Sequence, residues 1–204
     1  VLPYQYNILN DAIPGIEKSH AIENIRLAAE KLRGKDVKPD EFYGMVFQDS
    51  DVAKWIEAAA YALAAGEDPE LEKAVDETIQ LYGASQHEDG YVDSYFTVKC
   101  PDKMWTNICD AHELYCAGHM MEAAVAYYEV TGKRELLDIM SKSADCIYEQ
   151  FMKKNTRAYP GHPEVELALM RLWRATGNEK YKELAKHFVD VRGQAPNYFV
   201  EEKK

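Results

Sequence analysis

The sequence predicts an all-α protein, an α/α toroid of antiparallel helical hairpins that is about half complete in this chain. Three observations predict this fold class. A short turn with a glycine recurs at Gly66, Gly132 and Gly177, each time between two segments of helical length. Segments before these turns are largely apolar, whereas those after them are amphipathic. Connections within a pair are short and those between pairs are long.

Each glycine turn has the sequence of a helix end followed at once by a helix start. We expect all three glycines to take the left-handed conformation that commonly ends helices. Asp68, which precedes Pro69, and Asn178 are suited to cap the next helix after the first and third turns. Turns this short require the two helices of a pair to lie antiparallel.

The two helices of a pair differ in their surfaces. Ranges 55–65 and 116–128 each carry one acidic or basic residue, so these helices are expected to be buried on all sides as an inner layer. Ranges 133–151 and 178–189 carry one apolar stripe, as outer helices do. A segment at roughly 16–33 is expected to be another outer helix. Because the ring is incomplete, its open edge should be covered by the remainder of the barrel or by a second copy.

The long connections, roughly 34–49, 85–109 and 153–161, all lead into the N-terminal ends of inner helices. Within the second one, a glycine turn is expected to join a short extended piece at 94–96. Loops carried on a rigid scaffold are where binding residues concentrate, and the N-terminal ends of helices add positive partial charge. A site is therefore expected on this rim.

The composition argues against several classes of function. The chain has 35 acidic and 24 basic residues and a net charge of −11, so neither nucleic acid nor a membrane surface is an expected partner. No run approaches the ~20 apolar residues that cross a bilayer, and no signal peptide is visible at the start. The four cysteines are too few for a disulfide framework. Free thiols and a cytoplasmic location are therefore expected.

Residues 110–119 are the most informative stretch, because they place two histidines and a glutamate in the most apolar helix. Burying an unpaired polar group costs about 1–3 kcal/mol, so these side chains need partners or a ligand. His112 is expected at the rim, and His119, two turns deeper, as a histidine partnered in the core. Gly118 in mid-helix indicates close packing against another element.

The last inner helix has a similar feature at its start. Pro163 at the first helical position makes His162 the expected N-cap, which is an unusual residue there. His112 and His162 would then hold equivalent positions on different inner helices and could converge on one ligand. Asp49 either caps the first inner helix or holds a ligand hydroxyl. Tyr95 and Phe96 either fill the rim or offer flat apolar faces to a sugar ring.

One spacing resembles a zinc motif over the residues Cys109, His112, Cys116 and His119. On one straight helix these positions span about 15 Å at a rise of 1.5 Å per residue. A single zinc ion needs four ligands arranged tetrahedrally around it. We therefore expect no zinc site from these four alone, although two of them could join ligands from elsewhere.

Five motifs follow one another along the chain, at 49–55, 86–97, 112–119, 159–169 and 192–199. In these motifs the sequence resembles the N-terminal half of the catalytic domain of glycoside hydrolase family 127, the β-L-arabinofuranosidases. The resemblance spans nearly the whole chain. Residues 1–204 are accordingly interpreted as the N-terminal part of such a domain.

The resemblance implies an (α/α)6 barrel with a furanoside pocket at its mouth, and retaining hydrolysis by a zinc-bound cysteine nucleophile and a glutamate acid/base. Those residues belong to the second half of the family's barrel, so we assign no catalytic or metal-binding residue here and expect zinc in the other half. The chain alone is expected to be inactive. The resemblance also implies that His112 and His162 contact substrate hydroxyls. Weaker candidates for the same role are Gln5, Asp49, Tyr95 and Phe96.

Two other functions stay open at this stage. The chain could be a non-catalytic helical-repeat module that binds protein or glycan on its concave face. It could also belong to another α/α-toroid sugar enzyme, such as an epimerase or an unsaturated-uronide hydrolase. A reading frame that continues past Lys204 into a cysteine-rich half would favour the hydrolase, and a stop codon would favour the module.

Overall fold

The computed structural model describes residues 13–154 and 158–195, and their regular structure is helical throughout. The helices are α2 (Ile13–Lys18), α3 (Ala21–Leu32), α4 (Asp49–Ala64), α5 (Pro69–Ala84), α6 (Ser94–Lys99), α7 (Glu113–Thr131), α8 (Glu135–Tyr148), α9 (Val165–Thr176) and α10 (Glu179–Arg192). Short 3-10 turns lie at Pro39–Glu41 and Pro101–Lys103, and a π-helical turn at Glu149–Lys153 prolongs α8. Among these helices, none is both long and apolar enough to cross a bilayer.

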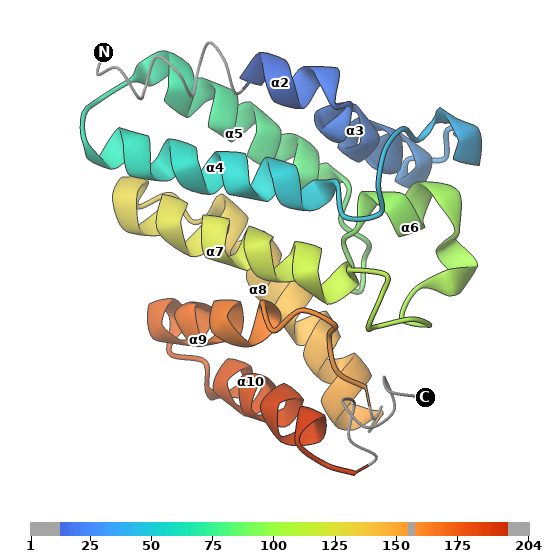
Figure 1. The fold of residues 1–204 in the computed structure, drawn as a ribbon. Helices are drawn as coiled ribbons and strands as arrows, with labels where there is room; N and C mark the ends of the chain where they lie inside the picture. Colours follow the sequence, from blue (N-terminus) through green and yellow to red (C-terminus); the bar gives the residue numbers. More distant parts are fainter. Residues whose placement is uncertain (1–12, 155–157, 196–204) are drawn as a thin grey trace.

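The helices form two layers, as predicted. α4, α7 and α9 lie side by side as the inner layer, with α7 in the middle. α5, α8 and α10 each follow an inner helix after a short turn and pack back against it (Figure 1). These three antiparallel pairs, preceded by α3, confirm an all-α fold consistent with part of an α/α toroid.

The turns within the pairs follow the prediction in two cases of three. Gly132 and Gly177 take the left-handed conformation, with φ of 74° and 73°. Gly66 does not, and the prediction there is wrong: α4 ends in a tighter turn, where the Gly66 N–H bonds the Leu63 carbonyl three residues back. That ending needs no positive φ.

Both predicted helix caps are confirmed. The Asp68 side chain accepts a hydrogen bond from the Leu71 N–H (3.1 Å) at the start of α5. The Asn178 side chain accepts one from the Lys180 N–H (3.3 Å) at the start of α10. These local bonds satisfy N–H groups that the first turn of a helix leaves without an intrahelical partner.

Two predicted elements differ in the structure. The segment at 16–33 is not one helix, because His20 takes a left-handed conformation (φ 63°) and separates α2 from α3. The piece at 94–96 is not extended: Asp93 accepts a hydrogen bond from the Phe96 N–H (3.0 Å) and starts the short helix α6. α6 packs against α3, which keeps α3 in the outer layer against α5.

Candidate functional site

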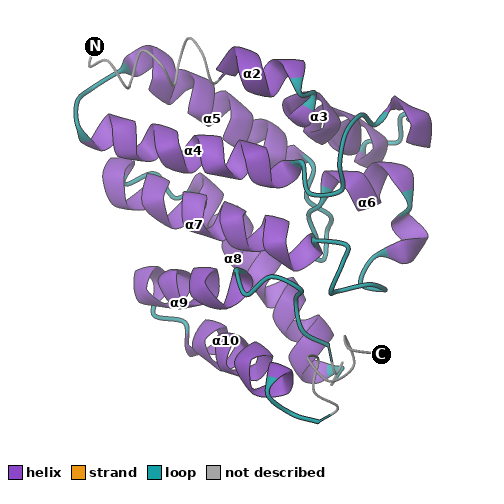
Figure 2. Ribbon diagram, viewed as in Figure 1, coloured by secondary structure: helices purple, strands orange, loops and turns teal. Residues whose placement is uncertain are grey.

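The three long connections gather at the end of the molecule where α4, α7 and α9 begin (Figure 2). Each brings one aromatic ring to a common point. The ring centroid of His112, before α7, lies 5.3 Å from Phe47, before α4, and 5.1 Å from His162, before α9. The structure thus brings together the two histidines that the sequence places at equivalent positions.

A fourth ring completes this group. Tyr115 lies in the first turn of α7, and its ring centroid is 5.6 Å from that of His112 and 5.1 Å from that of His162. We call Phe47, His112, Tyr115 and His162 the rim cluster. Sequence reasoning did not select Tyr115 as a site residue. Its spacing of three residues from His112 was the available signal, since residues i and i+3 share a helix face.

His112 is held in an unusual backbone conformation. It is the N-cap residue of α7 with φ of 62°, in the left-handed region that non-glycine residues seldom occupy. Its ring Nδ1 lies 2.5 Å from the Asp110 carbonyl oxygen, which can only accept a hydrogen bond. Nδ1 therefore carries the proton, and Nε2 of the neutral ring is an acceptor suited to a hydroxyl group.

The loop with His162 is shaped by close backbone contacts. His162 is not the N-cap of α9, so that prediction is wrong: the cap residue is Glu164, whose N–H bonds the His162 carbonyl (2.9 Å) and inserts a turn before the helix. A side chain at Gly161 would collide with the carbonyl oxygen of Cys109. His162 itself is exposed to solvent.

Gly118 explains how α7 and α9 approach one another. A Cβ atom at this position would lie 2.9 Å from Cγ of Glu164 and 3.0 Å from the backbone nitrogen of Val165. The close packing that the mid-helix glycine predicted is therefore confirmed. This contact fixes the start of α9 against the second turn of α7, and so sets where His162 lies relative to Tyr115.

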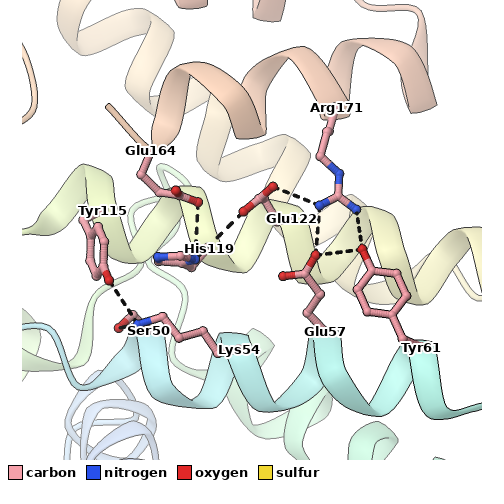
Figure 3. A network of polar contacts seen from close by, with 9 residues as sticks. All are labelled: Ser50, Lys54, Glu57, Tyr61, Tyr115, His119, Glu122, Glu164 and Arg171. Atoms are coloured by element: carbon pink, nitrogen blue, oxygen red, sulfur yellow. Dashed lines mark hydrogen bonds and ion pairs between the residues drawn. The ribbon is translucent and has the colours of Figure 1, made fainter. Parts of the chain in front are cut away.

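Below the rim, polar side chains bridge the three inner helices (Figure 3). His119 Nδ1 lies 3.3 Å from Oε1 of Glu164 and 3.9 Å from Oε2 of Glu122. Arg171 pairs with Glu122 and with Glu57, at 2.9 Å each. The Tyr61 hydroxyl donates a hydrogen bond to Glu57 and accepts one from Arg171. We call these six residues the inter-helix network: Glu57, Tyr61, His119, Glu122, Glu164 and Arg171. His119 is thus partnered, as predicted.

Burial shifts the pKa of two members of this network in the direction that favours the uncharged form. Burial and the neighbouring Glu122 carboxylate raise the pKa of Glu164 to about 8. Burial and the charge of Lys54 lower the pKa of His119. At neutral pH, therefore, Glu164 holds a proton and the fixed cation of the network is Arg171.

The network also contains the candidate for metal binding. Within residues 13–154 and 158–195, one group brings possible ligand atoms within 4.8 Å of one another, namely His119, Glu122 and Glu164. Arg171 already neutralises Glu122. Two cysteines belong to the other candidate, the zinc-like spacing of Cys109, His112, Cys116 and His119. Burial raises the pKa of the Cys116 thiol well above its ordinary value. The Cys109 thiol donates a hydrogen bond to the Tyr159 carbonyl (3.4 Å).

The other sequence candidates lie in different surroundings. Asp49 is 3% exposed and is the first residue of α4 rather than its cap, and its carboxylate accepts hydrogen bonds from the N–H (2.7 Å) and hydroxyl of Ser94. The Tyr95 ring packs 5.3 Å from Phe42 and 5.2 Å from Phe96, beside α3. Gln5 lies outside the described residues.

The glutamate that the sequence analysis noted within residues 110–119 is Glu113, and it shapes the second long loop. Glu113, 2% exposed, accepts hydrogen bonds from the Trp105 N–H (3.0 Å) and the Tyr91 hydroxyl (2.7 Å). Burial raises its pKa to about 7. Trp105 has a positive φ of 62°, so this carboxyl holds a strained backbone turn directly before the rim cluster.

The family model for the GH127 catalytic domain of β-L-arabinofuranosidase matches residues 3–204. The chain belongs to glycoside hydrolase family 127. This finding confirms the resemblance drawn from the motifs, and the two layers of helices are those of a GH127 domain.

Relatives and solved structures agree with this assignment. A non-reducing end β-L-arabinofuranosidase of Bifidobacterium longum is 41% identical over the whole of this chain, which spans 33% of that relative. The crystal structure of a GH127 β-L-arabinofuranosidase from Geobacillus stearothermophilus T6 matches 98% of the chain with 53% identity and a TM-score of 0.81. A second GH127 β-arabinofuranosidase structure matches 89% with 35% identity and a TM-score of 0.80. The chain spans about a third of each of these proteins.

Proposed function

We propose that this GH127 chain forms the sugar-binding rim of a glycoside hydrolase that acts on β-L-arabinofuranosides. The observation that carries the proposal is the convergence of His112 and His162, with ring centroids 5.1 Å apart, at the N-terminal ends of adjacent inner helices. The relatives named as β-L-arabinofuranosidases support the substrate class.

The rim cluster offers what a furanoside needs. Nε2 of His112 accepts a hydrogen bond from a sugar hydroxyl, and the exposed His162 ring offers a second polar contact. Tyr115 adds an aromatic face beside both rings. Small ligands bind where apolar walls meet a few convergent polar groups. Asp49, whose carboxylate is already bonded to Ser94, is a weaker part of the proposal.

The reacting groups belong to the rest of the domain. Retaining hydrolysis needs a nucleophile and an acid/base on the two sides of one glycosidic bond. We assign neither to this chain. The zinc that the family implies would stabilise the thiolate form of a cysteine nucleophile when bound. The Cys109 and Cys116 thiols do not fit that task, because burial raises the pKa of both.

Tyr61 and Leu167, on the inner helices α4 and α9, are 54% and 55% exposed, which supports a cover from the remainder of the barrel or a second copy. The four cysteines are free, which is usual in a reducing compartment such as the cytoplasm.

A chimaeric enzyme tests the proposal, in which this chain replaces the matching third of the Geobacillus stearothermophilus relative. We expect His112→Ala to lower kcat/KM for an aryl β-L-arabinofuranoside at least tenfold, because an unpaired sugar hydroxyl costs about 1–3 kcal/mol. His187→Ala, on the outer helix α10, is the matched control and should leave kcat/KM unchanged. An unchanged kcat/KM in His112→Ala would refute the role of the rim cluster. Turnover by the isolated chain would refute the absence of catalytic residues.

A further inference from the structure

The segment of residues 159–166 carries His162 and leads into α9, and one side chain from the far end of the partner helix α10 contacts it at three points. Arg192, the last residue of α10, donates a hydrogen bond to the Pro160 carbonyl. Its guanidinium lies 5.2 Å from the Tyr159 ring centroid and 3.5 Å from the Glu166 carboxylate. These contacts lie on both sides of His162 in the sequence.

The contact between Arg192 and Glu166 is an ion pair with a buried acid. Glu166 is 8% exposed, and among the described residues Arg192 is the cation recorded within ion-pair distance of it. Burial raises the pKa of Glu166, so the carboxyl is costly to ionise without that cation. Losing Arg192 would therefore release the loop and leave a buried acid without its counter-charge.

The opposite side of the loop is fixed by Cys109, in the segment before α7. Gly161 lies against the Cys109 carbonyl so closely that no side chain fits, and the Cys109 thiol donates to the Tyr159 carbonyl (3.4 Å). The loop is thus clamped between the segment before α7 and the Arg192 side chain. Any displacement of the loop would carry the His162 ring away from His112.

We propose that Arg192 is a positioning residue for sugar binding, which acts by holding the His162 loop in register with His112 and Tyr115. The inference rests on the proposed function, since His162 must bind the sugar for its position to matter. Arginine suits this role because its planar group can bond a carbonyl, pair with a carboxylate and stack on an aromatic ring at once. A lysine offers a point charge and can keep only part of these contacts.

The test uses the same chimaeric enzyme and a double-mutant cycle. We expect Arg192→Met to lower kcat/KM about tenfold, mainly through a higher KM, because a displacement of about 1 Å in a binding group is enough for such a loss. Arg192→Lys should show an intermediate loss. In a His162→Ala background, Arg192→Met should change kcat/KM less than twofold. Arg134→Met, which removes an exposed pair with Asp138, is the matched control.

The cycle separates positioning from general stability. If Arg192→Met lowers kcat/KM equally with and without His162, it acts through the fold as a whole and the inference is overturned. If it has no effect in the parent enzyme, the inference is also overturned. If His162→Ala itself changes nothing, the proposed function fails instead.

A spectroscopic measurement on the chain itself supports the kinetic one. The chain has six histidines, so their ring 1H–15N signals can be assigned individually. We expect Arg192→Met to shift the His162 ring signals, which lie beside the Tyr115 ring, and to leave those of His20, which packs against Tyr43, in place. Unchanged His162 signals would overturn the positioning role even if the kinetics changed.

Discussion

The rim cluster and the inter-helix network lie on the same three inner helices, yet their polar atoms are used differently. In the network, Arg171 bridges two carboxylates at 2.9 Å and His119 faces two carboxyl groups. In the rim cluster, within the part of the chain that the structure describes, one polar bond involves a histidine ring, and it joins Nδ1 of His112 to the Asp110 carbonyl oxygen.

Exposure differs in the same direction. The side chains of His119, Glu122 and Arg171 at the centre of the network are 16%, 11% and 24% exposed, and Tyr61 at its edge is 54% exposed. In the rim cluster His162 is open to solvent and the other three rings are half-buried. Polar groups that already have partners stabilise the packing of helices, and those with free capacity remain available to a ligand. The comparison therefore separates structural from binding residues on one set of helices, and it can be tested at three points.

The largest expected effect is on stability, at the centre of the network. Arg171→Met leaves Glu57 and Glu122 without their cation, and should lower the free energy of unfolding by about 2 kcal/mol, less than for a fully buried pair because Arg171 is partly exposed. Denaturant unfolding measures this loss. Arg134→Met, which breaks an exposed pair, should cost below about 0.5 kcal/mol. Equal losses in both variants would show that the network does not hold the helices together.

The second expected effect depends on pH. Glu164 has a raised pKa of about 8 in the folded chain, so it binds its proton more tightly than in the unfolded chain. Its contribution to stability is therefore present below the ordinary glutamate pKa and is lost as pH rises toward 8. Glu164→Gln, which cannot ionise, should gain about 1 kcal/mol relative to the parent between pH 5 and pH 9, since the group is only partly desolvated.

The control for this titration is Glu135→Gln at the exposed start of α8. It gives the change in unfolding free energy that the same amide substitution makes at an exposed site, and Glu164→Gln is compared with it. The lowered pKa of His119 changes the unfolding free energy with pH in the opposite direction, and it does so at acidic pH. The change of the unfolding free energy with pH above pH 7 is therefore the decisive part. A flat difference for Glu164→Gln above pH 7 would contradict the protonated carboxyl in the network.

Sequence reasoning succeeded where the signal is local or topological. The Asp68 cap was predicted correctly, because it depends on two residues close in sequence: the Asp68 side chain accepts from the N–H of Leu71, three residues later. The convergence of His112 and His162 followed from topology, because the starts of adjacent inner helices share a rim. Gly118 predicted a close contact but could not say with what.

The failures concern interactions that span distant parts of the chain or backbone states with no residue signature. The His119–Glu164 contact depends on the register between α7 and α9, which is set by packing at Gly118 and is not written in either helix. His20 breaks a helix in a left-handed conformation that sequence patterns assign mainly to glycine. Asp49 has the sequence of a cap, but its carboxylate bonds Ser94, 45 residues away.

The smallest expected effect lies where the two regions meet. The Tyr115 ring belongs to the rim cluster, while its hydroxyl accepts a hydrogen bond from Lys54 Nζ (3.0 Å) on α4. In the chimaeric enzyme, Tyr115→Phe should therefore raise KM less than about twofold, since an exposed hydrogen bond contributes little. Tyr115→Leu, which removes the aromatic face, should raise KM about fivefold and shows that the assay detects a loss of the ring. Equal losses in the two variants would mean that the hydroxyl itself contacts the sugar. Lys54, which bonds this hydroxyl, would then also belong to the sugar-binding rim.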